Sequence, residues 1–384
     1  MKYRILGRTG LEVSEIGLGG EWLERQSAES VKSMIDRAAE FGINILDCFM
    51  SNPEVRDRIG AAIAPRREKW VVQGHLCSVW ENGQYGKSRD MKKVKFFFED
   101  LLRRMKTDYI DVGMIHYVDT PDEYDAVVRD GVFDYARRLK EEGKIRYIGL
   151  SSHDARTAKM AAASGSVDVI LFSVNPAFDL LPSNTDIMSM FEEAVYADPK
   201  LGGAIQPERD DFYRFCDREG VALTVMKCYG GGNLLKEKSS PFGVALTPLQ
   251  CIHYALTRPA VASVLAGFSE PKHIDEAVAY ETAPPESLDY ASVLACAPKH
   301  AYSGQCLYCG HCAPCPVKID VAMVNKLADL ASFSNEIPGT IREHYKGLVR
   351  HASDCMACGQ CEKRCPFGVP VAERMRAAAA RFGL

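Results

Sequence analysis

Two short runs of cysteines near the C-terminal end carry the most specific chemical signal in this sequence. Eight of the fourteen cysteines lie in these runs, and a proline follows the last cysteine of each. Repeated Cys-x-x-Cys spacing that ends in Cys-Pro is typical of bacterial-ferredoxin-type 4Fe-4S clusters, in which three close thiolates bind one cluster and the fourth reaches the other. We therefore expect two clusters. The predicted ligands are Cys306, Cys309, Cys312 and Cys365 for one cluster and Cys355, Cys358, Cys361 and Cys315 for the other.

Zinc ribbons and disulfides are the alternative interpretations of such runs. A zinc ribbon uses two well-separated Cys pairs, which leaves the third and fourth thiolates of each run without a role. Disulfides do not require this spacing. The second run matches the bacterial motif in full, whereas the first run is one residue short before its last cysteine, Cys315.

The composition is that of an ordinary globular protein. Of the 384 residues, 47% are hydrophobic and 26% are charged. The net charge of -4 and the pI near 6.2 give no basic surface, so we expect no nucleic-acid partner. The N-terminal residues lack an apolar signal core, and no stretch approaches the roughly 20 apolar residues of a membrane helix. We expect a cytoplasmic protein with no membrane association.

The elements that position any further chemistry precede the cysteine runs. Short apolar runs alternate there with amphipathic stretches of helical length, which is typical of repeated βα units around a parallel sheet. Eight such units predict a (β/α)8 TIM barrel of the α/β class, with chemistry at the carboxyl ends of the strands. The predicted strands are 16–19, 43–47, 70–73, 109–115, 147–151, 167–172, 222–226 and 261–265.

Two smaller features complete the predicted organisation. Residues 3–6 and 11–13 flank a Gly-Arg-Thr-Gly turn and predict an N-terminal hairpin that closes the barrel floor. A Pro-rich joint at 282–286 places the domain boundary, with the barrel in 1–283 and a small α-helical ferredoxin-like iron-sulfur domain in 284–384. A mostly helical spacer from about 321 to 352 separates the two cysteine runs.

Several segments of the first domain, in collinear order, resemble the aldo-keto reductases. The cysteine runs resemble the ferredoxin-like tail of the bacterial subgroup of that family that carries 4Fe-4S clusters. The segments that carry the resemblance to the reductases are 6–14, 17–19, 42–47, 115–116, 143–151 and 230–235.

The resemblance implies a catalytic group of Asp, Tyr, Lys and His that passes hydride from NADP(H) or NAD(H) to a carbonyl. The Asp corresponds to Asp47 and the His to His116, whereas Asn52 stands in the Tyr position and His75 in the Lys position. Because Asn cannot donate a proton near neutral pH, another acid is needed. We favour His75 over Tyr85, which lies in a predicted loop; His75 could instead be a buried histidine that bonds to Asp47 for structure only. Two histidines and a carboxylate could also bind non-haem iron.

The resemblance also implies a cofactor groove, although some of its expected residues are replaced. Ser151 and Ser152 stand where the family holds the nicotinamide carboxamide, and Asn175 matches a family position after the sixth strand. Lys227 adds a cation beside the groove. The remaining predicted cofactor residues are Gly267, Ser269, Lys272 and Glu276 for the adenosine phosphate and adenine, and Gly230 and Gly231, which could also approach an FMN phosphate.

Three functions remain open from the sequence. The clusters could accept or deliver electrons for a small carbonyl or hydroxy substrate at the barrel mouth, with a ferredoxin or flavodoxin-like partner outside and a bound flavin or nicotinamide inside. The inner cofactor is needed because a cluster moves one electron at a time, whereas NAD(P)H gives up two as hydride. The barrel could instead be a nicotinamide-dependent carbonyl reductase whose clusters are structural or sensing. The protein could also be a non-catalytic electron carrier or binding module.

Overall fold

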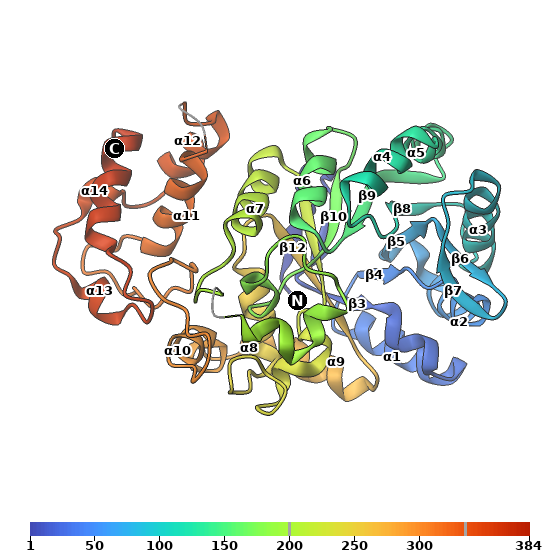
Figure 1. Cartoon of the computed structure of the whole chain (residues 1–384), viewed down its shortest axis with the longest axis horizontal. Helices are drawn as coiled ribbons and strands as arrows, with labels where there is room; N and C mark the ends of the chain where they lie inside the picture. The colour runs from blue at the N-terminus through green and yellow to red at the C-terminus, as the bar shows by residue number, and fades with distance from the viewer. Residues whose placement is uncertain (199–200, 334–335) are drawn as a thin grey trace.

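The computed structural model describes residues 1–198, 201–333 and 336–384, and its large domain is a closed barrel of eight parallel strands (Figure 1). This confirms the predicted TIM barrel. Each predicted strand is present, with ends that differ by a few residues. The strands are β3 (Ile16–Gly19), β4 (Ile45–Cys48), β5 (Val71–Leu76), β8 (Ile110–Ile115), β9 (Ile145–Ser152), β10 (Val169–Ser173), β11 (Ala222–Met226) and β12 (Val261–Gly267).

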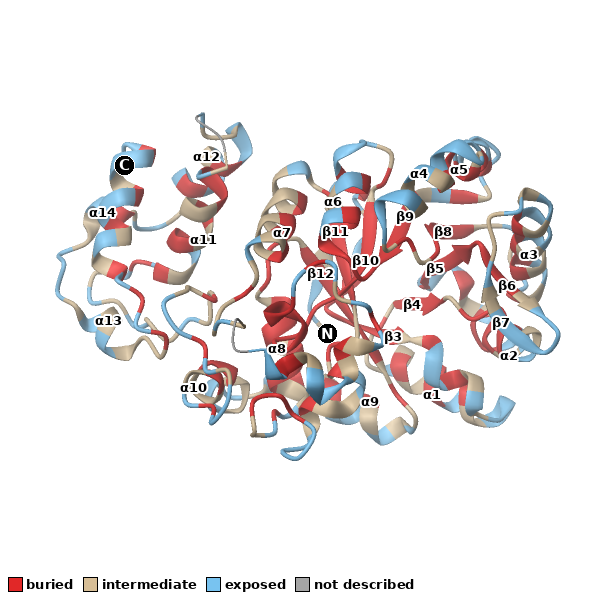
Figure 2. Cartoon of the chain, viewed as in Figure 1, coloured by how far each residue is buried: buried red, intermediate tan, exposed pale blue. Residues whose placement is uncertain are grey.

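Helices cover the outside of the barrel because each buries one apolar face on the strands and leaves a polar face in solvent (Figure 2). Most begin at a Ser, Thr, Asp or Asn whose side chain accepts from a backbone N–H of the first turn. The helices are α1 (Ala28–Glu40), α2 (Pro53–Ile63), α3 (Met91–Arg104), α4 (Pro121–Arg129), α5 (Val132–Glu141), α6 (Ala155–Ala163), α7 (Pro207–Glu219), α8 (Pro248–Leu256) and α9 (Pro271–Val278).

The N-terminal hairpin closes the barrel floor, as the sequence predicts. Its strands β1 (Tyr3–Ile5) and β2 (Glu12–Ser14) are antiparallel. Leu6 and Val13 are fully buried in one apolar cluster with residues that point into the barrel. The mouth at the opposite end is therefore the open end of the barrel.

A second hairpin follows β5, where the sequence interpretation places a loop. Its strands are β6 (Ser78–Glu81) and β7 (Gln84–Lys87). The two residues between them, Asn82 and Gly83, have φ values of 52° and 74°. Asn-Gly with two positive φ angles is the favoured two-residue hairpin turn. The hairpin projects beyond the end of β5, and its second strand, β7, brings Tyr85 back to the barrel mouth.

The C-terminal region packs against one outer wall of the barrel (Figure 1). Its first helix lies on α8, and α11 lies on α7. The two cysteine runs lie on either side of α11 and α12, which confirms the predicted helical spacer. No helix among the described residues is long and apolar enough to cross a membrane. The helices are α10 (Tyr290–Ala295), α11 (Val321–Ala331), α12 (Gly339–Lys346), α13 (Gln360–Arg364) and α14 (Val371–Phe382).

Candidate functional site

The three predicted catalytic residues meet at the barrel mouth. Asp47, His75 and His116 come from the ends of β4, β5 and β8, which are neighbours in the barrel. All three are at most 5% exposed. The Nε2 atom of His75 lies 2.9 Å from Asp47 Oδ1, and His75 Nδ1 lies 2.7 Å from His116 Nδ1. Gln73 also donates to Asp47 Oδ1, at 3.0 Å.

Tyr85 extends this row of hydrogen bonds toward solvent. Its hydroxyl contacts His116 Nε2, while its ring is 44% exposed. Phe49 stacks on His116 with a centroid separation of 5.7 Å and meets the Tyr85 ring edge to face. The hairpin is held in place because Ser78 Oγ donates to Phe49 O at 2.6 Å and Ser51 Oγ donates to Val79 O.

The hydrogen-bond directions follow for neutral imidazole rings. A carboxylate only accepts, so His75 donates from Nε2 to Asp47, and a neutral His75 ring then carries no proton on Nδ1. A neutral His116 in turn donates from Nδ1 to His75, which leaves His116 Nε2 to accept from the Tyr85 hydroxyl. Tyr85, His116 and His75 then form one row of donors that leads to Asp47.

The electrostatics of the mouth agree with this arrangement. Burial, and then the neighbouring His75, lower the pKa of His116 well below its usual value. Desolvation raises the pKa of Tyr85 to about 12. His116 is therefore an uncharged acceptor and Tyr85 a protonated donor over the whole neutral range.

Asn52 does not take part in the mouth. Its side chain accepts from the Glu54 backbone N–H at the start of α2 and donates to Glu24 Oε1 at 3.0 Å. The expected Tyr position has thus become a helix cap. The hydroxyl at the mouth comes instead from Tyr85, the donor that we ranked second from the sequence.

The predicted iron alternative for the mouth gains no support from the geometry. Among the described residues, no three His, Cys, Asp or Glu side chains are placed to hold one metal ion. The nitrogen atoms of His75 and His116 face each other at hydrogen-bonding distance rather than converging on a shared point.

The predicted carboxamide residues lie at the mouth, but their polar atoms are already bonded within the protein. Ser151 Oγ accepts from the Tyr117 backbone N–H at 2.8 Å. Ser152 Oγ lies 3.3 Å from Asp119 Oδ1. Asn175 donates to Lys227 O at 2.8 Å and accepts from Phe178 N at 2.9 Å. Each group thus has part of its hydrogen-bonding capacity taken within the protein, while a hydroxyl or an amide keeps a further donor or acceptor position for a ligand.

The glycines of the predicted phosphate loop serve internal packing. Gly230 and Gly231 have φ values of 56° and 66°, and a Cβ on Gly231 would lie 2.8 Å from the Phe191 ring. The close approach that glycine permits is therefore to a side chain of the protein. A Cβ on Gly267 would likewise meet Trp22, at 2.4 Å.

The remaining predicted cofactor residues lie around the start of α9. Ser269 Oγ lies 3.3 Å from His273 Nδ1, and Lys272 pairs with Glu270 at 2.8 Å. Lys272 and Glu276 are exposed. These residues share one edge of the barrel with Gly267 at the end of β12, as the resemblance implies.

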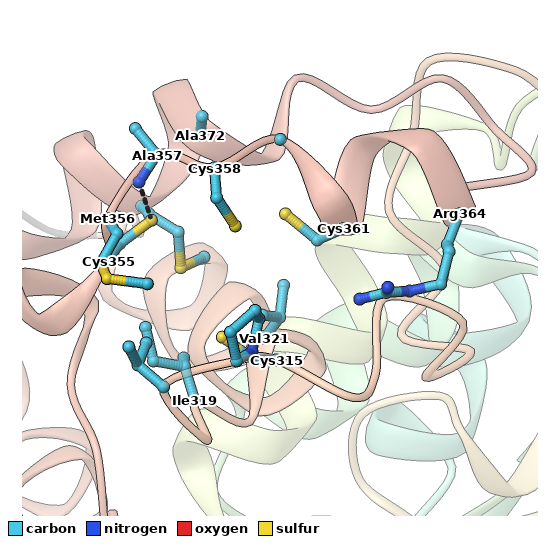
Figure 3. Close-up of a pocket in the computed structure, with 14 residues that line it drawn as sticks. Cys315, Ile319, Val321, Cys355, Met356, Ala357, Cys358, Cys361, Arg364 and Ala372 are labelled. Atoms are coloured by element: carbon cyan, nitrogen blue, oxygen red, sulfur yellow. Dashed lines mark hydrogen bonds between the residues drawn. The ribbon is translucent and has the colours of Figure 1, made fainter.

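The cysteines of the second run gather with one cysteine of the first. A pocket beside α13 is lined by Cys315 together with Cys355, Cys358 and Cys361. Figure 3 shows the sulfur atoms of Cys358 and Cys361 pointing toward each other, with Cys315 across the pocket. These four cysteines are the crossed set that the motif predicts as ligands of one cluster.

The other predicted set is also crossed. Burial raises the pKa of Cys309, and the nearby Cys365 raises it further. Burial raises the pKa of Cys306 to about 11 and that of Cys312 to about 12, so these thiols must lose protons when they bind a cluster.

A buried polar atom without a partner supports the fit of a cluster at the second site. Arg364 lines the second pocket and donates to Cys312 O at 2.8 Å, while its Nε atom is buried and unpartnered. A buried donor of this kind requires an acceptor, and cluster sulfurs are acceptors.

The comparisons with known proteins agree with both parts of the geometry. Residues 15–198 match the model of the aldo/keto reductase family, and residues 305–370 match the model of the 4Fe-4S dicluster domain. The chain thus contains an aldo/keto reductase family domain followed by a 4Fe-4S dicluster domain. The family matches give no support for FMN.

Relatives and solved structures cover the barrel domain of this chain. The uncharacterized oxidoreductase YqkF of Bacillus subtilis is 27% identical over 283 residues, which span 72% of this chain and 90% of YqkF. L-Galactose dehydrogenase of Arabidopsis thaliana is 26% identical over 303 residues, which span 73% of this chain and 88% of that protein. An aldo-keto reductase of Bacillus halodurans in its holo form shares the fold, with a TM-score of 0.56, 23% identity, and coverage of 75% of this chain and 94% of its own.

The dicluster domain contacts the barrel through a buried arginine. Arg258, 2% exposed, precedes β12 and donates to Leu307 O between the first two cysteines. Tyr290 donates to the same carbonyl at 3.0 Å and meets the Tyr254 ring edge to face at 5.2 Å. No ion pair of Arg258 with a carboxylate occurs within the described part of the chain. The second site faces outward, because Cys358 is exposed and Met356 is 62% exposed.

Sequence reasoning missed a second polar group at the mouth. His153 Nδ1 lies 2.9 Å from Asp119 Oδ2, and His153 Nε2 lies 3.1 Å from Lys227 Nζ. The signal was present, since Asp119 and His153 each follow a predicted strand by only a few residues, where barrel chemistry is expected. Lys227 was identified, but without these partners.

Proposed function

We propose that this protein interconverts a hydroxyl group and a carbonyl group on a small substrate at the barrel mouth, with Tyr85 as the group that exchanges the proton. The observation that carries the proposal is the unbroken row of hydrogen bonds from Tyr85 through His116 and His75 to Asp47. Proton exchange with an oxygen atom is the step that any such oxidoreductase must catalyse.

The resting direction of the hydrogen bonds suits oxidation of a hydroxyl group. As Tyr85 takes the substrate proton, it passes its own to His116 Nε2. His116 passes the Nδ1 proton to His75, which passes the Nε2 proton to Asp47. Each residue ends with the same charge except Asp47, which gains one proton. Because the transfers can be concerted, the raised pKa of Tyr85 does not require a free tyrosinate. Carbonyl reduction runs the same row in reverse.

The two electrons of this reaction need an acceptor or donor. Oxidation of a hydroxyl group to a carbonyl releases two electrons and two protons. When bound, the two 4Fe-4S clusters would accept one electron each, the row takes the proton of the hydroxyl oxygen, and the proton of the carbon would pass to solvent at the mouth. The cysteine arrangement places one site against the barrel wall at Arg258 and the other toward solvent at Cys358. This order suits an external ferredoxin or flavodoxin-like partner at the exposed site.

A second candidate is a nicotinamide-dependent carbonyl reductase with structural or sensing clusters. The family match favours it, because aldo/keto reductases use NADP(H) or NAD(H). The internal hydrogen bonds of Ser151, Ser152 and Asn175 take up part of the hydrogen-bonding capacity that a nicotinamide would use at its usual place.

Anaerobic protein with both clusters oxidised distinguishes the two. Small hydroxy compounds are added alone or with NADP+, and reduced clusters are counted by electron paramagnetic resonance while product is measured by chromatography. Cluster reduction in step with product, without NADP+, supports coupling. Product that forms only with NADP+ and leaves the clusters oxidised supports the second candidate.

A further inference from the structure

The Asp119, His153 and Lys227 group lies beside the Tyr85 relay but does not belong to it. Lys227 directly follows β11 and has a φ of 59°. Its side chain reaches His153, which directly follows β9, across the end of β10 that lies between these two strands. His153 is 6% exposed, and its ring packs edge to face on Tyr117 at 5.3 Å. Tyr117 follows His116 directly, so the two groups occupy adjacent strand ends.

The hydrogen-bond directions leave Lys227 with donors to spare. Asp119 accepts from His153 Nδ1, and Asp119 Oδ1 also accepts from the His153 backbone N–H at 2.7 Å. His153 Nε2 is then an acceptor for one Lys227 proton. The other described contact of the ammonium is the Met226 sulfur at 3.6 Å, a weak acceptor. An ammonium has three donors, so this leaves it under-satisfied.

Lys227 also lacks a counter-ion at contact distance within the described part of the chain, because the carboxylate of Asp119 accepts from His153 instead. Desolvation lowers the pKa of Lys227, and the more distant charges of Glu21, Asp119 and Asp47 only partly oppose this. A half-buried cation of this kind is costly unless an anion joins it.

We propose that Lys227 binds a carboxylate of the substrate, so that the substrates are 2-hydroxy or 2-oxo acids or related carbonyl compounds with a carboxylate. This rests on the proposed function of the mouth and specifies its substrate class. The carboxylate would accept hydrogen bonds from the two remaining N–H donors of Lys227. The adjacent hydroxyl or carbonyl group of the substrate would face Tyr85 and His116.

The phosphate groups of a nucleotide are the other source of an oxyanion, and the position of Lys227 Nζ favours the substrate. Lys227 Nζ points toward His153, which follows β9, and therefore toward the strand ends that carry Ser151 and His116. The predicted adenosine phosphate residues lie instead beyond β12, at the start of α9. Lys227, the proposed carboxylate anchor, thus lies next to the proton relay of Tyr85, His116, His75 and Asp47 rather than next to the start of α9.

Direct binding to the full cluster-loaded protein tests the assignment without turnover. The probes are pyruvate, phenylpyruvate and 2-oxoglutarate, with methyl pyruvate as the uncharged analogue and NADPH as the nucleotide, each titrated by calorimetry. The variants are Lys227→Met and Lys227→Arg. Lys236→Met is the matched control, because Lys236 is exposed on the loop that follows β11.

We expect at least one 2-oxo acid to bind, and Lys227→Met to weaken it about tenfold or more while methyl pyruvate and NADPH are unchanged. Lys227→Arg should recover part of the loss, and Lys236→Met should have no effect. Absence of binding for all three acids, equal binding in Lys227→Met, or a loss confined to NADPH would overturn the assignment. Unchanged thermal unfolding shows that Lys227→Met is folded.

The two proposals fail separately. If acids bind through Lys227 but Tyr85→Phe retains full turnover, the proton relay is wrong and the anchor stands. If Tyr85→Phe is inactive and Lys227→Met binds the acids as tightly as the unaltered protein, the proton relay stands and the Lys227 anchor is wrong.

Discussion

The barrel mouth and the cysteine sites differ in how complete they are without a cofactor. At the mouth, Asp47, His75, His116 and Tyr85 satisfy one another and lie on strand ends fixed by the barrel. At the cysteine sites, thiols face an open pocket and the buried donor Arg364 Nε has no partner. The first site is pre-organised by the fold, whereas the second acquires its bonding from what it binds.

The largest expected effect separates proton transfer from cluster binding. Tyr85→Phe removes the hydroxyl that exchanges the substrate proton, so turnover should fall by about 10²- to 10⁴-fold while iron content stays unchanged. Steady-state kinetics and iron analysis on the same sample measure both. The matched control is Tyr3→Phe, which removes a hydroxyl that donates to Gly42 O at the barrel floor. Loss of iron in Tyr85→Phe would show that the two sites are not independent.

The pH dependence tests the neutral state of the relay. His116 must be unprotonated to accept from Tyr85, and burial lowers its pKa, so activity is lost only as the pH falls through that lowered value. Tyr85 must be protonated, and its pKa is raised to about 12, so no loss is expected on the alkaline side up to about pH 10. The expected profile of kcat/KM is flat from about pH 6.5 upward. A fall centred near pH 6.5 would contradict a neutral buried His116.

Substitution of one predicted ligand cysteine should remove one cluster and leave the other in place. Cys309→Ser and Cys358→Ser belong to different predicted ligand sets, so each should lose about half of the iron and leave the barrel folded. Iron and acid-labile sulfide analysis measures the loss, and far-ultraviolet circular dichroism reports the barrel. Cys296→Ser, an exposed cysteine outside both runs, is the control. Full iron in either variant would contradict the ligand assignment.

Arg258 connects the two regions, and its replacement should affect only the inner site. Arg258→Met removes a buried positive charge beside Leu307 and leaves a buried carbonyl short of a donor, at a cost of about 1–3 kcal/mol. Loss of a nearby positive charge also makes reduction of a cluster less favourable, so one of the two cluster potentials should fall. A redox titration followed by electron paramagnetic resonance measures both potentials. Equal shifts in the two cluster potentials would contradict the assignment of one cluster to the barrel side and the other to the solvent side.

The smallest expected effect is at Asn52, which stands in the Tyr position of the aldo-keto reductases. Asn52→Ala should reduce the free energy of unfolding by about 1 kcal/mol, because the helix α2 loses its cap. Asn52→Tyr should lose the same cap and gain no carbonyl reductase activity, since this side chain faces Glu24 rather than His116. Thermal unfolding and a carbonyl reduction assay check the pair. A gain of activity in Asn52→Tyr would show that the position still reaches the mouth.

The barrel and the ligand cysteines could be predicted because their signals are local. Apolar runs of strand length mark the eight strands, and Cys-x-x-Cys spacing marks the cluster ligands whatever the rest of the fold does. The juxtaposition of Asp47, His75 and His116 also followed, because adjacent parallel strands end at the same rim.

The relay and the anchor were harder to predict because they depend on loops. The role of Tyr85 depends on the Asn82-Gly83 turn, a hairpin signal that the sequence interpretation passed over. The Lys227 contact with His153 depends on a positive φ at Lys227, which lets the chain turn at the end of β11. Neither contact follows from strand periodicity.

The protonation pattern of the two relay histidines tests the central claim most directly and needs no substrate. Protein labelled with ¹⁵N histidine is examined at neutral pH by long-range ¹H–¹⁵N correlation, with His75→Gln and His116→Gln to assign the signals. We predict a neutral His75 protonated on Nε2 and a neutral His116 protonated on Nδ1, with the His116 Nε2 signal shifted in Tyr85→Phe. A His116 that is protonated on Nε2, or that carries a positive charge, would contradict a relay that runs from Tyr85 to Asp47.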